Sequence, residues 1–543
     1  MPEWRNGRRR GLKILRPRGR VSSTLTSGTI DCCEGAPSVA PFCLFLEGSL
    51  YGNGDVGGDL PKALRRLGGF SFRPIQAFVF LFSIYLIALT PLVRADFDYI
   101  DDSGRVMFGY DGWDNFSRHV SQHLSHVVHA SGYLSDISPL TQILAIAILS
   151  LAGLILIRAV RGQDNYSPWD LLAVIPIGLN PYFLECLSYK YDSLYMALSI
   201  LFAIMPLWLI AKNKLVYLVS VVVFTLGMCM TYQAASGIFP MAVIVIALLR
   251  WSRGDDAREA GVFVASSALA YLAGVLIFQV FLMTPVDGYV SNGIAAPAEM
   301  VQNLVAFWGL VLHDLKRGWL LLFALAAVAF PVLVSFESKL SKTVTFLVAA
   351  CVLPMLFSLT FGLYPALKTP LMSPRAMYGF GTLLSLLLLG CLSRRSRIIA
   401  WAPRTLAVVF AWCFVTFACT YGNALSQQAD WEDFRRQEIV DDLTDLPEYL
   451  ATDQKSIQLV GSVGHALPIR NASAGLPILQ RLVPVTLVQD WAWGDYRLLN
   501  YYGLGASGDR TRFVSEYTDY TLVHESAYHA IYHKDGHFVI ELR

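Results

Sequence analysis

The sequence predicts a polytopic α-helical membrane protein with about eleven transmembrane helices and a small C-terminal extracytoplasmic α/β domain. Of its 543 residues, 55% are hydrophobic and only 15% are charged, whereas soluble domains carry about 25% charged residues. Apolar runs of about 20 residues, long enough to cross a ~30 Å hydrocarbon core, recur from residue 74 to residue 420. From Tyr421 to the end of the chain, 17 acidic residues stand against 10 basic ones, and the long apolar runs stop.

Short polar connectors divide the membrane region, 74–420, into individual spans. Two connectors are longer than the others, 94–137 and 284–317, and long loops are more often functional than short ones. We predict spans at 74–93, 138–157, 169–187, 193–211, 215–231, 234–250, 261–283, 318–336, 343–364, 376–392 and 404–420.

Basic residues gather in alternate connectors, and this asymmetry predicts the orientation of the chain. Cytoplasmic connectors carry an excess of Lys and Arg. The pattern places the N-terminus in the cytoplasm, and it places the loops 94–137 and 284–317 and the region 421–543 on the outer side. The basic residues concerned are Lys62, Arg65, Arg66, Arg73, Arg158, Arg161, Lys212, Lys214, Arg250, Arg253, Arg258, Lys339, Lys342, Arg394, Arg395, Arg397 and Arg404.

Residues 1–73 form a predicted extension that is either disordered or the product of a misplaced start codon. The extension contains Arg8-Arg9-Arg10 but no apolar core after it, so it does not resemble a signal peptide. Residues 2–9, PEWRNGRR, resemble the translation of a bacterial leucine tRNA gene, which favours the misplaced start codon. The alternative is a basic arm that binds anionic lipid or nucleic acid.

The region 421–543 is predicted to be a soluble α/β domain. Ile457–Val463 has the composition of a strand, and Tyr528–His533 and His537–Leu542 flank Lys534-Asp535-Gly536, which indicates a hairpin. The chain contains no glycine-rich phosphate loop, so nothing indicates a nucleotide-sugar domain. The nine cysteines lie in the extension or in and beside apolar runs, which favours packing roles over a disulfide framework.

The strongest catalytic candidates lie in the segment YIDDSGR, residues 99–105, just beyond the first span. Adjacent carboxylates at a membrane edge are costly unless they are solvated or paired. Asp102, with Asp101 as the close alternative, could act as a general base toward a sugar hydroxyl. Arg105 would either keep that acid ionised or bind a phosphate. The competing interpretation is a solvated pair of loop acids.

Other polar residues are predicted to lie near the same membrane surface. Asp136 either caps the second span or belongs to the site. Lys190-Tyr191-Asp192, which follows the helix-breaking Asn180-Pro181, is either a tight connector or a polar wall of the site. Arg375 precedes the tenth span, and its planar guanidinium suits a phosphate. The predicted substrate-binding residues are Arg105, Asp136, Lys190, Tyr191, Asp192 and Arg375.

Four histidines recur at helical spacing in the first outer loop: His119, His123, His126 and His129. Histidines four residues apart can bind zinc, but no acid or cysteine completes a familiar metal motif. An amphipathic helix on the membrane is favoured instead, and no metal or other cofactor is predicted. Aromatic residues of the C-terminal region either stack on a sugar ring or belong to a folding core or an interfacial belt. They are Trp491, Trp493, Tyr501 and Tyr502.

From about residue 74 to the C-terminus, the chain resembles the serotype-converting O-antigen glucosyltransferases of the GtrII-like family, within the GT-C membrane glycosyltransferases. The extension lies outside this resemblance. The segments that carry it are YIDDSGR at 99–105, SDISPLTQILAIA at 135–147, LNPYFLECLSYKYDSLYMALS at 179–199, MTYQAASGIFP at 230–240, SPRAMYGF at 373–380 and TYGNALSQQADWEDFR at 420–435.

The resemblance implies a GT-C-like transmembrane domain and a hexosyltransferase of the bacterial inner membrane. Its donor would be a polyprenyl-phosphate glucose, and its acceptor would be lipid-linked O-antigen at the outer face of that membrane. A small flippase and a donor synthase would be partners, with no nucleic acid involved. In such enzymes a first-loop acid serves as the base, and this role transfers to Asp102 or Asp101.

Two other functions remain open from the sequence. A transporter or flippase of lipid-linked glycans should show paired broken helices or acids near the bilayer centre. Glu185 is the main such acid, and it lies toward the outer end of its span. A non-catalytic assembly subunit would not need the group formed by Asp101, Asp102, Arg105 and Arg375.

Overall fold

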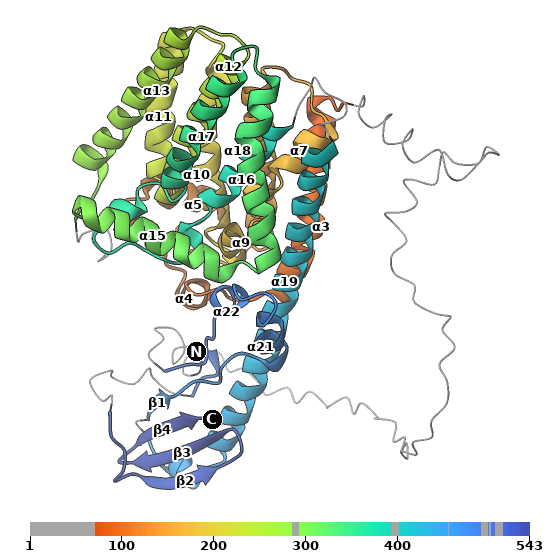
Figure 1. The fold of residues 1–543 in the computed structure, drawn as a ribbon. Coiled ribbons are helices and arrows are strands. Elements are labelled where there is room, and N and C mark those ends of the chain that lie inside the picture. Colours follow the sequence, from red (N-terminus) through yellow and green to blue (C-terminus); the bar gives the residue numbers. More distant parts are fainter. Residues whose placement is uncertain are drawn as a thin grey trace, which may run out of the picture. The chain divides into compact units, whose positions relative to one another are not determined.

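The computed structural model describes residues 71–284, 293–392, 401–453, 455–489, 498, 501–504 and 514–543. The predicted extension lies outside these residues except for its last three. Helices dominate from Pro74 to Thr444, and a small sheet follows near the C-terminus (Figure 1).

Seven helices within the described part of the chain are long and apolar enough to cross a membrane. Each coincides with a predicted span, which confirms a polytopic helical membrane fold. Their bounds are α3 (Pro74–Ala95), α6 (Leu140–Arg161), α12 (Ile238–Ser252) with its leading turn η3 (Gln233–Gly237), α13 (Ala257–Ile277) with η4 (Phe278–Leu282), α16 (Arg317–Glu337), α17 (Lys342–Leu359) and α19 (Trp401–Thr444).

The predicted count of eleven spans is not confirmed. One further predicted span is a bent pair of helical segments, which raises the count of candidate spans to at most eight. The other three predicted spans are shorter apolar helices of 10–17 residues, which cover at most about 26 Å at 1.5 Å rise per residue. The bent pair is α7 (Pro168–Val174) and α8 (Pro176–Leu179) with α9 (Pro181–Ser188), and the short helices are α10 (Ser193–Ile204) with η2 (Met205–Leu209), α11 (Lys214–Cys229) and α18 (Gly379–Cys391).

Asn180-Pro181 breaks the third span, as the sequence predicts, and the two halves meet at 58°. Pro181 has no N–H for the helix before it, and Asn180 replaces the missing bonds with its own side chain. Asn180 Oδ1 accepts from the N–H of Tyr182 at 3.1 Å, and its Nδ2 donates to the carbonyl of Pro176 at 2.9 Å. The break therefore turns α9 toward the connector that holds Lys190.

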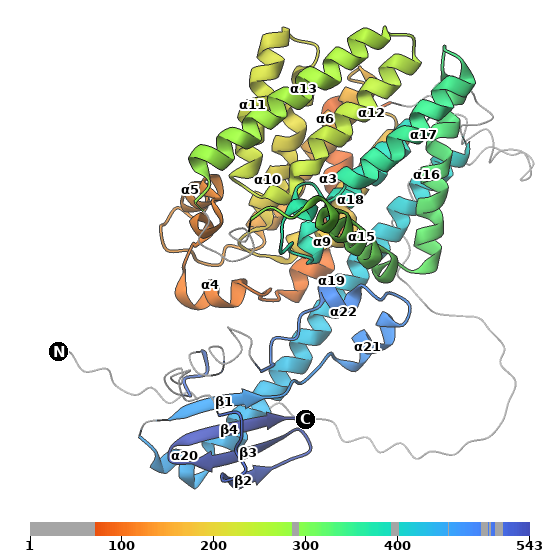
Figure 2. The same cartoon turned by 60° about the vertical axis from the view of Figure 1, so that its left-hand side comes forward.

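Two glycines allow helices to approach this region closely. A Cβ on Gly381 of α18 would lie 2.2 Å from the carbonyl oxygen of Pro176. A Cβ on Gly422 of α19 would lie 2.3 Å from the backbone nitrogen of Leu92 in α3. Any larger residue at either position would push the helices apart, and Figures 1 and 2 show α3 and α19 running side by side.

The two long connectors contain helices of their own. In Figure 1, α15 lies across the ends of the spans rather than parallel to them. The first connector, 94–137, contains α4 (Asp102–Phe108), η1 (Trp113–Phe116) and α5 (His119–Val128), and the second contains α15 (Pro297–Asp314). Two further short turns, η5 (Tyr364–Ala366) and η6 (Pro374–Ala376), precede α18.

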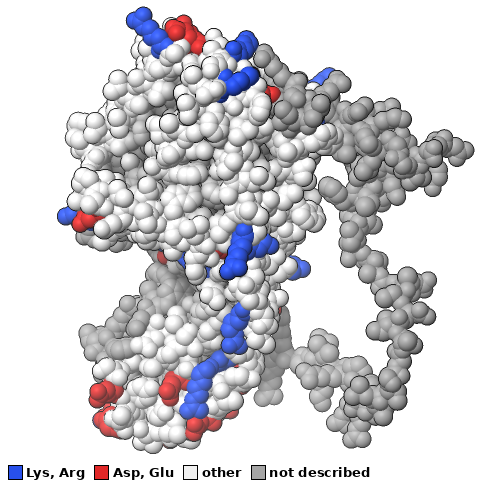
Figure 3. Space-filling view, in the orientation of Figure 1, with Lys and Arg blue, Asp and Glu red and all other residues white. Residues whose placement is uncertain are grey.

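The surface of the helical region suits a hydrocarbon environment. Figure 3 shows a broad face without charges over these helices, with charged side chains gathered toward its ends. Large apolar side chains point outward there, and Leu321 of α16 is 72% exposed. Such a face would be costly in water, because apolar burial contributes about 25 cal/mol per Å².

The C-terminal region begins within a helix and not at a break. The 44 residues of α19 continue past Tyr421 and end at Thr444. After α20 (Pro447–Ala451), a four-stranded sheet has the order β1-β4-β3-β2, with β1 parallel to β4 and the other pairs antiparallel. Ile439 and Leu443 of α19 pack against Ile531 and Ile540 of the sheet. The strands are β1 (Ser456–Val460), β2 (Thr521–Glu525), β3 (His529–Lys534) and β4 (His537–Leu542).

The predicted hairpin is confirmed, with Lys534 paired to His537. Asp535 and Gly536 form its two-residue turn with φ of 48° and 78°, which are the positive values that such a turn requires. The predicted strand at 457–463 is also present, although β1 ends at Val460. Trp491 and Trp493 lie outside the described residues.

One segment of the C-terminal region returns to the membrane helices. It contains α21 (Leu467–Ser473) and α22 (Leu479–Leu482), whose apolar side chains belong to the same core as the spans. The carbonyl of Leu482 accepts from the hydroxyl of Tyr99 at 2.7 Å and from that of Tyr421 at 3.2 Å. This segment therefore rests on the loop that carries the predicted catalytic acids.

Candidate active site

The loop after α3 has an unusual backbone that brings its acids together. Asp96, which ends α3, has φ of 46°, and so has Ile100. A positive φ is an outlier for a β-branched residue such as Ile100 and costs of order 1–3 kcal/mol. Such strain persists only where the surrounding contacts impose it, and it is concentrated at functional sites.

Asp102 supplies some of these contacts, and its side chain is fully buried. Its Oδ2 accepts from the N–H of Tyr99 at 3.2 Å and from the N–H of Lys190 at 2.9 Å. Its Oδ1 is buried without a hydrogen-bond partner among the described residues. Burial raises the pKa of Asp102 well above its ordinary value, and Arg105 offsets only part of that effect. Asp102 therefore joins two loops, and its environment favours the protonated form.

Arg105 is also buried, and its guanidinium forms an ion pair with Asp192. The same guanidinium lies 4.5 Å from the centre of the Trp113 ring, and the indole N–H of Trp113 donates to Asp192. We call Asp102, Arg105, Trp113 and Asp192 the buried clasp. Within the clasp Arg105 is neutralised, so it is not free to bind a phosphate.

Two more predicted residues border the clasp. The Tyr191 ring stacks on His129 with centroids 5.7 Å apart, and its hydroxyl is buried without a hydrogen-bond partner in the described parts of the chain. Asp101 precedes α4, and its side chain makes no capping hydrogen bond to that helix. Asp101 is only partly buried.

Lys190 joins the clasp to a second group of acids. Its carbonyl accepts from Thr141 and its N–H donates to Asp102, so its backbone is fixed on both sides. Its Nζ lies 2.7 Å from Asp96, 2.8 Å from Asp98 and 3.2 Å from Asp136. Three carboxylates surround one ammonium group, which leaves a net negative charge.

This group opens on a cavity of about 450 Å³, which we call the acidic cavity. The cavity lies where the end of α3, the start of α6 and the α9–α10 connector meet. Asp102, Arg105 and Arg375 are not among the residues that line it. Its lining residues are Leu92, Val93, Asp96, Phe97, Asp136, Ser138, Pro139, Gln142, Ser188, Lys190 and Leu425.

Asp136 is the best-positioned carboxylate in the acidic cavity. Its Oδ1 accepts from the N–H of Ser138 at 2.8 Å, and its side chain remains 31% exposed. Burial alone would raise its pKa, but the Ser138 N–H and Lys190 outweigh burial and lower it below the ordinary value. Asp136 is therefore ionised and fixed in place. Asp96 is 73% exposed and less constrained.

Lys190 remains charged in this setting. Burial alone would lower its pKa, but Asp98, Asp96 and Asp136 raise it above the ordinary value. The Lys190 ammonium group already occupies the position among the three acids that a metal ion would need.

Arg375 lies in a different group, on the other side of the α9–α10 connector. Its guanidinium contacts the hydroxyl of Tyr189 and lies 3.8 Å from Glu185. Tyr189 is the chain neighbour of Lys190, and its hydroxyl contacts Arg375 while the Lys190 ammonium group contacts the acids. The Tyr189 ring packs edge-on against Tyr99 at 4.9 Å. Arg375 and the clasp are thus linked through aromatic rings and not by direct contact.

A second arginine, Arg481 of α22, belongs with this group. Its guanidinium pairs with the buried Asp314 and donates to the carbonyl of Met372 at 2.6 Å. Its side chain is 22% exposed, close to the 23% of Arg375. Arg375 and Arg481 therefore form a partly open pair of guanidinium groups, and each lies beside a buried acid, Glu185 and Asp314 respectively.

The residues of these groups that were not predicted from the sequence include Asp96, Asp98, Trp113, Asp314 and Arg481. The alternating pair Asp96 and Asp98, placed directly at the end of the first span, was a signal available in the sequence. Arg481 gave no signal, because nothing in the sequence shows that α22 returns to the membrane helices.

The four histidines of the first connector fall on or beside α5 and do not converge. His119 pairs with Asp114 at 2.7 Å, and His126 pairs with Asp111 at 3.0 Å. The buried residues of α5 are Ser121, Gln122 and Ser125, so the helix turns a polar face inward. Its predicted helical character is confirmed.

Comparison with known proteins identifies a family and one relative. The sequence model of the glucosyl transferase GtrII family matches residues 90–386, which include both connectors' ends, Lys190 and Arg375. The chain is 24% identical over 462 residues to a protein of Salmonella phage P22, described as an uncharacterised 55.3 kDa protein in the region 5′ of gtrB. That match covers 77% of this chain and 89% of the phage protein. No solved structure gives a significant match.

The matched region contains five of the seven long apolar helices, the buried clasp and every residue that lines the acidic cavity except Leu425. It covers more than half of the chain. The chain is a membrane protein that belongs to the GtrII family of glucosyltransferases, the family of O-antigen serotype conversion.

Proposed function

We propose that the protein transfers a glucosyl (hexosyl) group from a polyprenyl-phosphate sugar to lipid-linked O-antigen at the outer face of the bacterial inner membrane. The single observation that carries this proposal is the acidic cavity at the ends of α3 and α6. A lipid-borne sugar would reach such a cavity from the membrane surface. A small flippase and a donor synthase would supply the donor.

The transfer needs one base and no strong acid. The acceptor hydroxyl attacks the anomeric carbon, the bond from that carbon to the phosphate oxygen breaks, and polyprenyl phosphate leaves. The hydroxyl proton moves to a carboxylate, and a positioned base contributes about 10²–10⁴-fold to such a step. The net negative charge around Lys190 would also stabilise the positive charge that develops on the sugar ring.

Asp136 is the group that we assign to this role, in preference to Asp102. A base must reach the substrate and be ionised, and Asp136 meets both conditions. Asp102 is enclosed, and two backbone N–H groups occupy one of its oxygens. The role of Asp102 is then to hold Lys190 and the Tyr99 loop in position.

The donor phosphate would bind at Arg375, with Arg481 beside it. A partly exposed guanidinium offers paired N–H donors to phosphate oxygens. Glu185 and Asp314 orient the two arginines.

The proposed orientation has the N-terminus in the cytoplasm and the C-terminus in the periplasm. It is supported by the basic residues at the helix ends opposite to the acidic cavity, such as Arg161 and Arg253. Alkaline phosphatase fused after Arg543 should be active, and a fluorescent reporter that works only in the cytoplasm should stay dark. The reverse pattern would contradict the orientation.

Mass analysis of lipopolysaccharide with and without the gene tests the function. A transferase adds one hexose to each O-antigen repeat when its flippase and donor synthase are present. A transporter or flippase of lipid-linked glycans, the second candidate, would change the amount or length of O-antigen without adding a hexose. An unchanged repeat mass in cells that contain the inserted protein would contradict the proposed transfer.

A further inference from the structure

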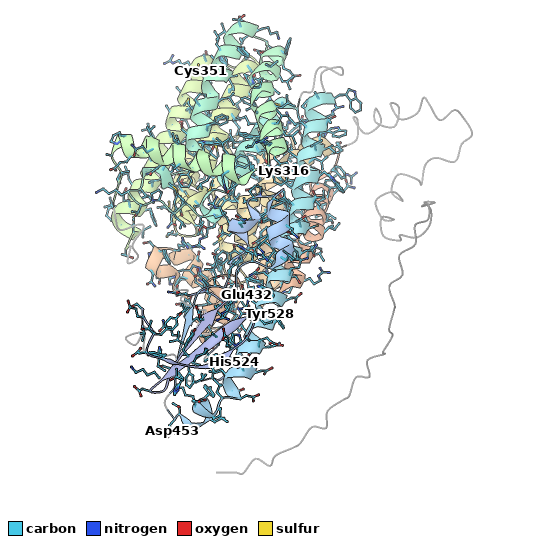
Figure 4. The ribbon with its side chains drawn as sticks, turned by 60° about the horizontal axis from the view of Figure 1, so that its bottom comes forward. Lys316, Cys351, Glu432, Asp453, His524 and Tyr528 are labelled. Atoms are coloured by element: carbon cyan, nitrogen blue, oxygen red, sulfur yellow. The ribbon has the colours of Figure 1, made fainter. Side chains whose placement is uncertain are left out.

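We infer that the C-terminal region binds a zinc ion through Asp442, His524 and His529. These residues come from the end of α19, from β2 and from β3. They lie outside the proposed active site, and the proposal does not depend on the transferase function. Figure 4 shows His524 among the side chains of the sheet region, well separated from Cys351 of the membrane helices.

The distances match a zinc ligand set. His524 Nε2 lies 3.0 Å from Asp442 Oδ2, and His529 Nε2 lies 3.2 Å from the same oxygen. Ligands at 2.0–2.2 Å from a tetrahedral zinc ion are separated from one another by about 3.3 Å. The three ligand atoms all lie within 4.8 Å of one another, and no other group of three or more His, Cys, Asp or Glu in the described residues has this geometry.

The histidine nitrogens have no other partner that would explain their position. His529 is fully buried, yet neither of its ring nitrogens has a hydrogen-bond partner among the described residues. His524 Nε2 is likewise buried and without one, because its contact with Asp442 lacks hydrogen-bond geometry. An unsatisfied buried polar group costs about 1–3 kcal/mol, and a metal ion at the centre would satisfy these nitrogens at once.

A β-bulge aims His524 at this point. Leu522 pairs with Tyr532, but the next pair is His524 with Ile531, so Val523 is an extra residue in β2. In a regular ladder Val523 would pair with Ile531, and His524 would face away from α19. The bulge turns His524 to the face that carries Ile531 and His529, and bulges commonly re-aim a side chain in this way.

A zinc ion at this site would also stabilise the edge strand β2. β2 is an edge strand, and Thr521, Leu522 and Glu525 are exposed. A zinc ion would bind this strand to the rigid end of α19. Asp442 and His524 are 29% and 28% exposed, which leaves room for water as the fourth ligand.

Zinc binding by the full-length protein in detergent tests the inference. The protein is treated with a chelator at neutral pH, supplied with Zn²⁺ alone and freed of unbound metal before elemental analysis. We expect about one zinc ion per chain and a higher thermal midpoint than for the chelated protein. Co²⁺ in place of Zn²⁺ should give the strong visible absorption of a tetrahedral site.

Three variants make the test specific. His524→Gln and Asp442→Asn should each weaken zinc binding by more than about 100-fold, because even the loss of a group that only supports a ligand costs 10–100-fold. His533→Gln, on the same hairpin but outside the group, should bind zinc as the parent protein does. If the parent binds no more zinc than His524→Gln, or if Co²⁺ gives only the spectrum of the hydrated ion, the inference is wrong.

Discussion

The buried clasp and the acidic cavity use the same residue types on the same two connectors, yet their environments are opposite. The clasp encloses its charges, and the Arg105 and Asp192 side chains are 6% and 7% exposed. At the acidic cavity, Lys190 contacts three carboxylates, and the two that line the cavity, Asp96 and Asp136, have side chains that are 73% and 31% exposed. In the clasp the positive and negative charges balance, whereas around Lys190 the negative charges outnumber the positive one.

This difference gives the clasp a structural role and the acidic cavity a chemical one. A buried, balanced set of charges holds loops in one geometry, and breaking it is costly. An open set with excess negative charge can take up a proton or stabilise a developing cation. Lys190 belongs to both, since its backbone is bound by Asp102 and its ammonium group by the acids. The clasp thereby positions the cavity.

The largest stability effect should follow from Asp192→Asn. This change leaves Arg105 buried without its counter-charge, which should cost about 3–5 kcal/mol. The thermal midpoint of the purified protein should fall sharply, and activity should fall with the folded fraction. Arg158→Met, which breaks a more exposed pair with Asp164, is the control and should cost less than about 1 kcal/mol. Equal effects of the two changes would mean that the clasp is not a structural element.

The next largest effect is expected on donor binding, from substitutions of Arg375. Arg375→Ala should weaken donor binding by about 1.5–3 kcal/mol, seen as a higher donor KM, because a charge-assisted contact is lost. Arg375→Lys should recover only part, since it keeps the charge but loses the planar fork. Lys368→Ala, an exposed cation on the same connector, should leave KM unchanged. An unchanged donor KM in Arg375→Ala would contradict the assignment.

Lys190→Met should change the pH dependence of catalysis more than its maximum. Burial raises the pKa of Asp136, and the Ser138 N–H and Lys190 lower it, so removing the ammonium group raises it again. The acid limb of the profile of kcat/KM against pH should move up by about one pH unit. If this limb does not move while the protein remains folded, the titrating group lies outside the acidic cavity.

The smallest expected effect is that of Asp102→Asn on the way the free energy of unfolding varies with pH. Because burial raises the pKa of Asp102, the folded state keeps a proton that the unfolded state releases. Its contribution is therefore present at acidic pH and is lost as pH rises from the ordinary aspartate pKa toward the raised one. Asp102→Asn, which stays neutral and still accepts hydrogen bonds, should flatten this dependence. A steeper dependence in the variant would reverse the assigned protonation.

Features that depend on local sequence were predictable. Asn180-Pro181 breaks its helix because Pro181 lacks an N–H, and Asp535-Gly536 forms a tight turn because it tolerates positive φ. The apolar runs likewise identified helices, although run length did not reveal that α10, α11 and α18 are shorter than the other membrane helices.

The candidate site was less predictable, because its residues meet only through tertiary contacts. Arg105 and Asp192 were both expected at the site, but no sequence pattern indicated that they pair with each other and are buried. Asp136 was open to two interpretations, and only its position beside Lys190 favours a functional one. A sequence pattern identifies acids near a membrane edge but does not show which of them is enclosed.

The most direct test of this account is the turnover of Asp136→Asn and Asp102→Asn, measured side by side on purified, folded protein with saturating donor. We expect Asp136→Asn to lower kcat by at least about 100-fold and Asp102→Asn to stay within about tenfold of the parent. If Asp96→Asn proves inactive instead of Asp136→Asn, the base is still an acid of the cavity. An inactive Asp102→Asn that folds normally, with Asp136→Asn and Asp96→Asn both active, would contradict the division between clasp and cavity.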